Sequence, residues 1–213
     1  MDVTTSSSWA PTAFAALAAF LSGSLPFALW AGRLWLRRDV REVGDGNPGA
    51  TNAYRAGGPL LGISVLLLDV TKGVLPIVLA RDALGLSGVS LALIAALTVA
   101  GAAFSPFLGF RGGKALAALL GTWIGLTLWT IPLVAVVAIV VAVFLVEPDG
   151  WAVAAALAAM LVGVVAWERD AALLVALLLQ SAIVLWKHRA DLAQAPHRRR
   201  QRAPGPRHAE PAP

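Results

Sequence analysis

Residues 58–80 read "GPLLGISVLLLDVTKGVLPIVLA", an apolar run that contains one acidic and one basic side chain. A run of this length can cross the roughly 30 Å hydrocarbon core of a bilayer as a helix. Asp69 and Lys72 stand three positions apart in it. Ionisable residues at membrane depth are either functional or neutralise each other inside a helix bundle, and both interpretations of this pair stay open. The stretch predicts a transmembrane helix.

Similar runs on both sides of this stretch predict an integral membrane protein. The chain has 213 residues, of which 58% are hydrophobic and 14% charged, whereas soluble domains carry roughly 25% charged residues. We expect an all-α, polytopic bundle of about seven transmembrane helices, at about 12–32, 58–80, 87–106, 115–130, 131–146, 150–167 and 171–187. Only a Thr-Pro step separates the fourth and fifth spans, and proline is tolerated in membrane helices, so six spans remain an alternative.

The basic residues predict how the bundle is oriented. Of 17 lysines and arginines, 14 fall in three segments: 33–57, 107–114 and the region from residue 187 onward. Loops rich in Lys and Arg stay on the cytoplasmic side. We therefore expect a cytoplasmic C-terminus and, with seven spans, an N-terminus outside.

Two units are expected along the chain. Residues 1–192 form a single transmembrane domain. Residues 193–213 are basic and rich in proline, which predicts a disordered cytoplasmic tail. The tail is either a solvated positive-inside anchor or a segment that lies on anionic headgroups. The chain contains no cysteine, which excludes disulfides and thiolate metal sites.

The polar stretch "REVGDGNPGATNAYRAGG", residues 41–58, predicts an anion-binding loop. Gly44, Gly46 and Gly49 allow a positive φ. Successive backbone N–H groups in such a turn form a nest for phosphate, although the spacing is not that of a P-loop or a dinucleotide-binding motif. Further donors and charges in this stretch are Asn47, Thr51, Asn52, Arg41 and Arg55.

Three other clusters are predicted on the same cytoplasmic side. "GFRGGKA", residues 109–115, is either a second nest with cationic walls or an ordinary positive-inside turn. Ser24 beside Pro26 either faces a ligand or bonds a carbonyl of its own helix, and His188 is either a catalytic group or a helix cap. Together these clusters indicate a membrane enzyme or carrier for a phosphorylated substrate, with no carboxylate cluster that would hold a metal.

The motifs "GSLPFALWAGRL", "DVREVGDGNPGATNAYRAGG", "LLLDVTKGVLP", "SPFLGFRGGKALA" and "HRADL" together resemble the acyl-phosphate-dependent glycerol-3-phosphate acyltransferases of bacteria, over residues 21–192. The resemblance implies transfer of a fatty acyl group from acyl phosphate to the 1-hydroxyl of sn-glycerol 3-phosphate, which gives lysophosphatidic acid and phosphate in phospholipid biosynthesis. It also implies a multi-pass protein of the bacterial inner membrane with its active site facing the cytoplasm.

The same resemblance implies partners and site residues. The partners are the two substrates and membrane lipid, with no metal, cofactor or nucleic acid, and we expect a monomer. The residues implied as catalytic are Ser24, Arg41, Lys114 and His188. Those implied as substrate-binding are Gly46, Asn47, Gly49, Thr51, Asn52, Arg55, Asp69, Lys72, Arg111, Gly112, Gly113 and Asp191.

Five positions inside these motifs differ from the family pattern: Asp45, Ala102, Ala115, Ala190 and Asp191. Asp45 stands where the family usually has serine, and Asp191 stands for an asparagine. A carboxylate beside a phosphate nest is expected to point away from it or to meet Arg41. These departures keep two alternatives open, a divergent paralogue with another acceptor or little catalysis, and a transporter of a phosphorylated metabolite. The lack of an inverted repeat weakens the transporter alternative.

Overall fold

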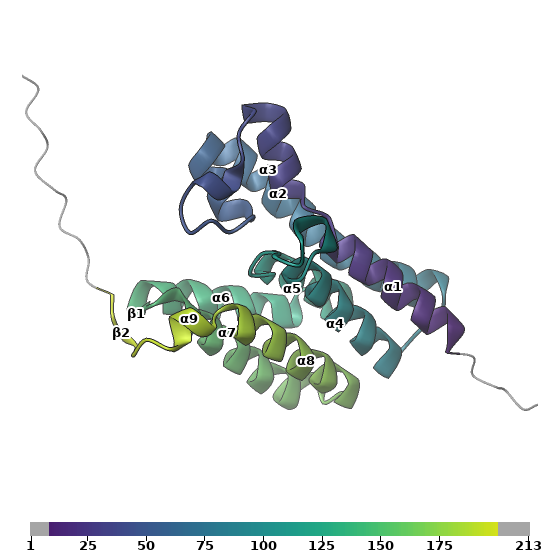
Figure 1. Ribbon diagram of the computed structural model, residues 1–213. Helices are drawn as coiled ribbons and strands as arrows, with labels where there is room; N and C mark the ends of the chain where they lie inside the picture. Colours follow the sequence, from purple (N-terminus) through teal and green to yellow (C-terminus); the bar gives the residue numbers. More distant parts are fainter. Residues whose placement is uncertain (1–8, 200–213) are drawn as a thin grey trace, which may run out of the picture.

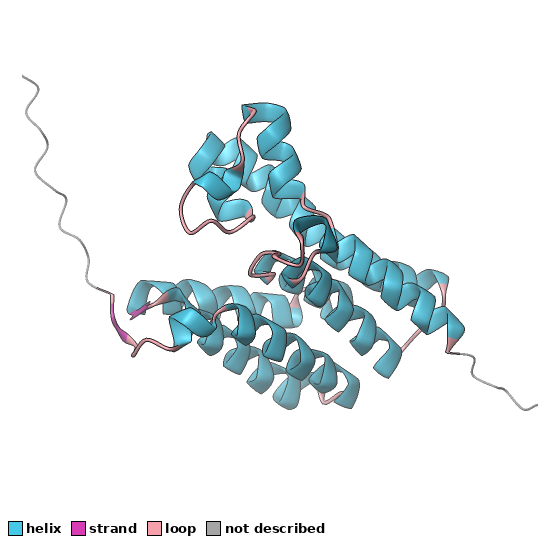
Figure 2. Cartoon of the chain, viewed as in Figure 1, coloured by secondary structure: helices cyan, strands magenta, loops and turns pink. Residues whose placement is uncertain are grey.

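Helices make up nearly all of the computed structural model, which describes residues 9–199 (Figures 1 and 2). The α-helices are α1 Ala10–Ser24, α2 Phe27–Ala31, α3 Ala50–Val78, α4 Val89–Ala103, α5 Leu116–Thr127, α6 Thr130–Leu145, α7 Asp149–Gly163, α8 Ala171–Lys187 and α9 Arg189–Leu192. Short 3-10 and π turns are η1 Gly32–Leu36, η2 Val40–Glu42, η3 Leu79–Ala83, η4 Pro106–Leu108 and η5 Val164–Glu168, and the two strands are β1 Val146–Glu147 and β2 His197–Arg198. The all-α prediction is confirmed.

Four helical segments are long and apolar enough to cross a membrane: Ala10–Leu36, Ala50–Ala83, Val89–Leu108 and Asp149–Glu168. Three shorter apolar helices, Leu116–Thr127, Thr130–Leu145 and Ala171–Lys187, overlap the remaining expected spans. The described residues therefore form an integral membrane bundle in which four helices reach spanning length by themselves.

Two of the long segments are broken next to a proline. α1 ends at Ser24 because Leu25, the residue before Pro26, is extended with ψ 122°. α3 is interrupted at Gly58, which precedes Pro59 and has φ 79° and ψ −171°. The part of α3 before this kink, from Ala50, lies inside the stretch that we predicted as a loop. That prediction is wrong for residues 50–57, because Gly49 ends the irregular segment and the alanines at 50, 53 and 56 favour a helix despite the less favourable residues between them.

Glycines let two pairs of helices approach closely. α1 packs along α4, and α3 packs along α5 (Figure 1). A Cβ placed on Gly23 or Gly101 would collide with the backbone of the facing helix in the first pair, and one on Gly73 or Gly121 would do so in the second. In lipid the hydrophobic effect does not drive helices together, so their association depends on close packing at small residues. These glycine positions therefore set the distance between the helices.

The second half of the chain packs beside the first through α4 and α8 (Figure 1). A fully buried polar chain fixes α5 to α8: Trp123 Nε1 donates to Gln180 Oε1 at 2.7 Å, and Gln180 Nε2 donates to Thr122 Oγ1 at 3.0 Å. α6 and α7 complete this half. Trp123 Nε1 and Gln180 Nε2 each have an acceptor in this hydrogen-bond chain, so these polar groups remain stable inside an apolar core.

The segment after the last long helix returns to the bundle. β2 pairs antiparallel with β1, with Val146 opposite Arg198 and Glu147 opposite His197. Trp151 Nε1 also donates to the carbonyl of Gln194 at 2.9 Å. Residues 193–199, which the composition assigned to a disordered tail, thus have a defined place in the structure. The rest of that predicted tail lies outside the described residues.

Candidate active site

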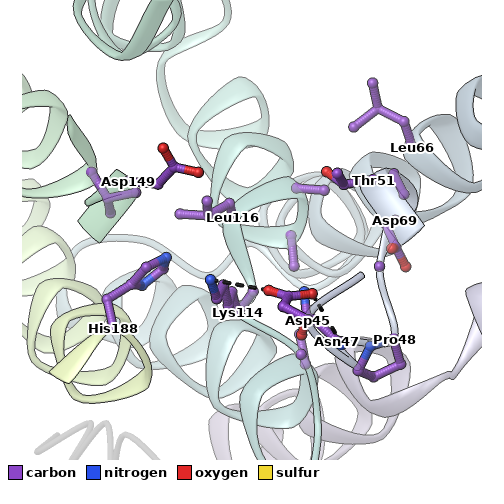
Figure 3. Close-up of a pocket in the computed structure, with 18 of the residues that line it drawn as sticks. Asp45, Asn47, Pro48, Thr51, Leu66, Asp69, Lys114, Leu116, Asp149 and His188 are labelled. Atoms are coloured by element: carbon purple, nitrogen blue, oxygen red, sulfur yellow. Dashed lines mark hydrogen bonds and ion pairs between the residues drawn. The ribbon is translucent and has the colours of Figure 1, made fainter. Parts of the chain in front are cut away.

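A cavity of about 730 Å³ opens between the ends of α1, α3, α5, α7 and α8. In Figure 3, Lys114 lies between His188 on one side and Asp45 on the other. Eleven of the predicted site residues line the cavity: Ser24, Asn47, Gly49, Thr51, Arg55, Asp69, Lys72, Gly113, Lys114, His188 and Asp191. The fold therefore brings residues of all five sequence motifs around one space.

Five predicted site residues do not line the cavity: Arg41, Gly46, Asn52, Arg111 and Gly112. Arg41 is turned toward Asp39, with its Nε 3.0 Å from Oδ1 and its Nη2 2.6 Å from Oδ2. This bidentate pair lowers the pKa of the Asp39 carboxyl, chiefly through the side-chain hydrogen bonds from Arg41. Arg41 is thereby turned away from the cavity.

The first glycine-rich loop has the predicted backbone at two of its three glycines. φ is 63° at Gly44 and 73° at Gly46. Gly49 has φ −144° and ψ 175°, so the prediction of a positive φ is wrong there. Gly49 is the residue that precedes helix α3, a position where extended backbone is usual. The left-handed turns therefore come before Asn47 and bring it to the cavity wall.

The first turns of α3 carry three of the predicted side chains. Thr51 and Arg55 line the cavity. Asn52 is 1% exposed and bonds back into the loop, with its Nδ2 2.9 Å from Asp45 Oδ1 and 2.9 Å from the carbonyl of Asn47. Its side chain therefore fixes the shape of the loop, while its neighbours on the helix face the cavity.

Asp45 meets Lys114 and not Arg41, so neither expectation for this carboxylate is correct. Asp45 Oδ1 accepts the backbone N–H of Asn47 at 3.2 Å, and Oδ2 lies 3.2 Å from Lys114 Nζ. Burial opposes ionisation of this carboxyl, but the hydrogen bonds from Asn47, Lys114 and Asn52 outweigh burial and lower its pKa. Asp45 is therefore an ionised wall of the cavity.

The second glycine turn differs from the predicted nest. The left-handed residues are Gly109, Phe110 and Ala115, with φ values of 59°, 61° and 62°. The predicted pair Gly112 and Gly113 has another role. A Cβ on Gly112 would collide with the backbone at Ala102, whose carbonyl also accepts the Gly113 N–H at 3.0 Å. The two glycines thus allow close packing of the turn against the end of α4.

Lys187 holds this turn against the end of α8, a role that sequence reasoning missed because it counted the residue only as a basic end of a span. Its Nζ donates to the carbonyls of Ala103 at 3.1 Å and Gly112 at 2.9 Å, and it lies 5.5 Å from the centre of the Phe104 ring. The turn that carries Lys114 is therefore tied to the helix that precedes His188.

Lys114 contacts both Asp45 and Asp191, two of the residues that differ from the family pattern. Its Nζ lies 3.2 Å from Asp45 Oδ2 and 3.6 Å from Asp191 Oδ2. The three residues come from the first loop, the second turn and α9. Two carboxylates that appeared harmful to an anion site are thus both offset by the same cation.

The two charged residues inside the second span, Asp69 and Lys72, form an ion pair within a single helix. Lys72 Nζ lies 2.7 Å from Asp69 Oδ1, and it also donates to the carbonyl of Leu25 at 3.0 Å. The Leu25 carbonyl is free for this bond because Pro26 breaks the first span. Both side chains line the cavity, so the pair neutralises itself and also contributes to the cavity wall.

His188 and Ser24 use their own helices as partners. His188 is 2% exposed, and its Nδ1 lies 2.9 Å from the carbonyl of Val184. Because a carbonyl only accepts, Nδ1 carries the proton, which leaves Nε2 of the neutral ring as an acceptor. Burial lowers the pKa of His188, opposed by the bond to Val184 and reinforced by Lys114. Ser24 Oγ donates to the carbonyl of Phe20 at 2.7 Å, which is the backbone bond that we left open.

Several cavity residues were not predicted. Ser105 donates from its Oγ to the carbonyl of Ser24 at 2.6 Å. At the opposite wall, Arg199 pairs with Glu147 at 2.9 Å and with Asp149. The cavity residues concerned are Ser105, Glu147, Asp149, Gln194, His197 and Arg199. The "EPDG" turn before α7 was a polar signal at the end of an apolar span, but its partner lay in the segment expected to be disordered.

Comparisons with known proteins place the chain in a family. A family model described as glycerol-3-phosphate acyltransferase matches residues 13–197. The chain is 37% identical to the glycerol-3-phosphate acyltransferase of Coxiella burnetii (strain Dugway 5J108-111), over 80% of this chain and 86% of that protein. It is 49% identical to the corresponding protein of Anaeromyxobacter sp. (strain Fw109-5), over 53% of this chain and 57% of that protein.

The fold is also similar to a solved structure. The crystal structure of PlsY (YgiH), an integral membrane glycerol 3-phosphate acyltransferase, in its glycerol 3-phosphate form, superimposes with a TM-score of 0.77. The two chains are 26% identical, and the match covers 85% of this chain and 90% of that chain. Because the family model spans most of the chain and the fold follows the same family, this protein belongs to the glycerol-3-phosphate acyltransferase family.

Proposed function

We propose that this protein transfers a fatty acyl group from acyl phosphate to the 1-hydroxyl of sn-glycerol 3-phosphate. The hydroxyl oxygen forms a bond to the acyl carbon, the bond from that carbon to the phosphate oxygen breaks, and the products are lysophosphatidic acid and inorganic phosphate. The proton of the hydroxyl passes to the departing phosphate. The observation that carries the proposal is the single cavity lined by the glycine-rich loop, Lys114 and His188.

The lining suggests how two phosphate-bearing substrates would be held. Lys114 supplies a cation of the cavity wall, and Asn47 and Thr51 supply side-chain donors from the loop and the start of α3. Such groups stabilise charge that develops on the acyl carbonyl and on the leaving phosphate. Since phosphate leaves readily, holding the two substrates together accounts for much of the rate.

His188 and Ser24 complete the proposed site. The unprotonated Nε2 of His188 accepts a hydrogen bond from the 2-hydroxyl of glycerol 3-phosphate, which orients the neighbouring 1-hydroxyl toward the acyl carbon. Ser24 keeps one acceptor position toward the cavity after donating to Phe20. Arg55 adds a second cation at the loop, and the Asp69–Lys72 pair closes the wall on the side of α3.

The membrane topology that fits this chemistry has seven spans, an outside N-terminus and a cytoplasmic C-terminus. The distribution of basic residues supports this topology, because Lys114, His188 and the first loop then share the cytoplasmic face of the inner membrane. We further propose a monomer, with residues 1–192 as the acyltransferase unit and 193–213 as its cytoplasmic extension, without a nucleic-acid partner.

An assay with defined substrates tests the proposal. The protein, purified in detergent, is given palmitoyl phosphate and labelled glycerol 3-phosphate without added metal, and lysophosphatidic acid is measured against inorganic phosphate. We expect equal amounts of the two products, and no product when palmitoyl-CoA replaces palmitoyl phosphate. Folded protein that forms no lysophosphatidic acid would contradict the proposal.

The same assay separates a second candidate, a transferase for another acceptor. The two cavity carboxylates beside Lys114, Asp45 and Asp191, favour this candidate, because they disfavour the binding of a second anionic substrate. Product that forms with glycerol or another neutral alcohol, but not with glycerol 3-phosphate, would establish it.

A further inference from the structure

Lys114 has two carboxylate partners that the fold holds with unequal strength. We propose that Asp45 fixes the position of this lysine, whereas Asp191 is a competitor that the anionic group of the substrate replaces. Asp45 is then a positioning residue, and Asp191 sets the affinity for anions. This assignment rests on the proposed function, because it requires a phosphate group in the cavity.

Asp45 is fixed by several bonds within its own segment. Its Oδ1 accepts from the backbone N–H of Asn47 at 3.2 Å and from Asn52 Nδ2 at 2.9 Å, which leaves Oδ2 for Lys114 at 3.2 Å. Asn52 is buried in the first turn of α3. The carboxylate is therefore oriented before the lysine arrives, and moving it breaks bonds to two other groups.

Asp191 is held more loosely. Among the described residues, Lys114 is its ion-pair partner, at the longer distance of 3.6 Å. Asp191 lies on α9, which is a single helical turn. A Cβ placed on Gly150 would lie 2.5 Å from the Cβ of Asp191. Gly150 thus leaves room for the Asp191 side chain beside the start of α7. Loss of the lysine costs this carboxylate one ion pair, and water can replace that contact.

The charges around Lys114 require such an exchange. The ammonium lies between two carboxylates, and the local sum is negative before any substrate binds. A phosphate that approached without displacing either carboxylate would meet net repulsion. When the phosphate takes the place of Asp191 beside the Lys114 ammonium, one carboxylate leaves the lysine. The bond from Asp45 that orients the lysine is kept. The identity of residue 191 therefore controls KM for the anionic substrate.

Lysine labelling measures this exchange without turnover. The chain has three lysines, Lys72, Lys114 and Lys187. The detergent-solubilised protein is treated with a water-soluble succinimidyl ester of acetic acid, and mass spectrometry follows each lysine as inorganic phosphate is raised. Phosphate bound at Lys114 shields it, so the concentration that halves its labelling reports phosphate affinity at that site. Lys187, which does not line the cavity, serves as the internal control for an intact fold.

Three variants distinguish the two carboxylates. Asp191→Asn should lower the half-protecting phosphate concentration about threefold, the size expected for loss of a part-exposed ion pair. Asp45→Asn should not lower it, and the control Asp82→Asn, whose carboxylate pairs with Arg81 outside the cavity, should leave it unchanged. An unchanged value in Asp191→Asn, or an equal decrease in both cavity variants, would overturn the proposal. Asp191→Ser repeats the test if the asparagine variant does not fold.

Kinetics then connect the exchange to catalysis. Asp191→Asn should lower KM for glycerol 3-phosphate about threefold with kcat retained, whereas Asp45→Asn should lower kcat. A wild-type protein that shows phosphate protection at Lys114 but forms no lysophosphatidic acid would refute the proposed function and leave the exchange intact. Turnover combined with a KM that is the same in Asp191→Asn and wild type would refute the exchange alone.

Discussion

The two lysines of the cavity belong to ion pairs of different construction. Lys72 and Asp69 stand on one helix, 2.7 Å apart, and their side chains are 9% and 11% exposed. Lys114 joins a loop, a turn and a short helix, at 3.2 Å and 3.6 Å from its partners, and its side chain is 32% exposed. A buried ion pair formed within one helix stabilises the bundle. A pair closed between segments at an open cavity can exchange its partner for a ligand.

The buried pair should show the largest effect on stability. Asp69→Asn leaves the Lys72 ammonium without its carboxylate inside the bundle, which should lower the free energy of unfolding by about 3 kcal/mol. Unfolding of the detergent-solubilised protein in increasing SDS measures this change. The double variant Asp69→Asn/Lys72→Met should recover most of the loss. Equal stability of Asp69→Asn and wild type would show that the two pairs do not differ as described.

The exchangeable pair should show the opposite pattern. Lys114→Met should reduce turnover about 100-fold, the usual effect of removing a group that stabilises transition-state charge. The free energy of unfolding should change by less than about 1 kcal/mol, because part-exposed ion pairs contribute little. Arg38→Met, an exposed cation that does not line the cavity, is the matched control. Normal turnover in Lys114→Met would remove the lysine from the site.

His188 should make the cavity region sensitive to pH. Its pKa is lowered in the folded state by burial, so between the unfolded value near 6.5 and the folded value the unfolded chain binds more protons. Its contribution to stability is therefore present above about pH 6.5 and is lost as pH falls through the folded pKa. The wild-type protein should lose more stability than His188→Gln between pH 7 and pH 5, measured by thermal unfolding in detergent. Parallel curves for the two proteins would contradict this assignment.

The smallest effect is expected at the wall formed by the C-terminal segment. Arg199→Met removes the pairs to Glu147 and Asp149, and should lower the free energy of unfolding by less than about 1 kcal/mol. KM for glycerol 3-phosphate should change less than about threefold. A loss of turnover as large as that of Lys114→Met would show that this wall takes part directly in the reaction.

Much of the fold follows from local pattern. Apolar runs locate the helices, and the prolines at 26 and 59 account for the breaks near them. The helix that begins at Ala50 was missed because glycines and asparagines on its N-terminal side extended the predicted loop too far. The bidentate pair of Asp39 and Arg41 joins residues two positions apart, so it could have been predicted from the sequence.

The partners of the cavity carboxylates were not predictable in the same way. Asp45, Lys114 and Asp191 are far apart in the chain, and only the packing of α3, α5 and α8 brings them together. The role of Arg199 was also hidden, because composition alone favoured disorder for its segment. Pattern therefore predicted eleven of the residues that line the cavity, but not how their charges are paired.

A structure of the protein with glycerol 3-phosphate bound tests the central claim most directly. The account predicts a phosphate oxygen in this cavity at about 2.8 Å from Lys114 Nζ, with Asp45 still on the lysine and Asp191 withdrawn from it. A phosphate bound elsewhere, with Lys114 remaining between both carboxylates, would contradict it.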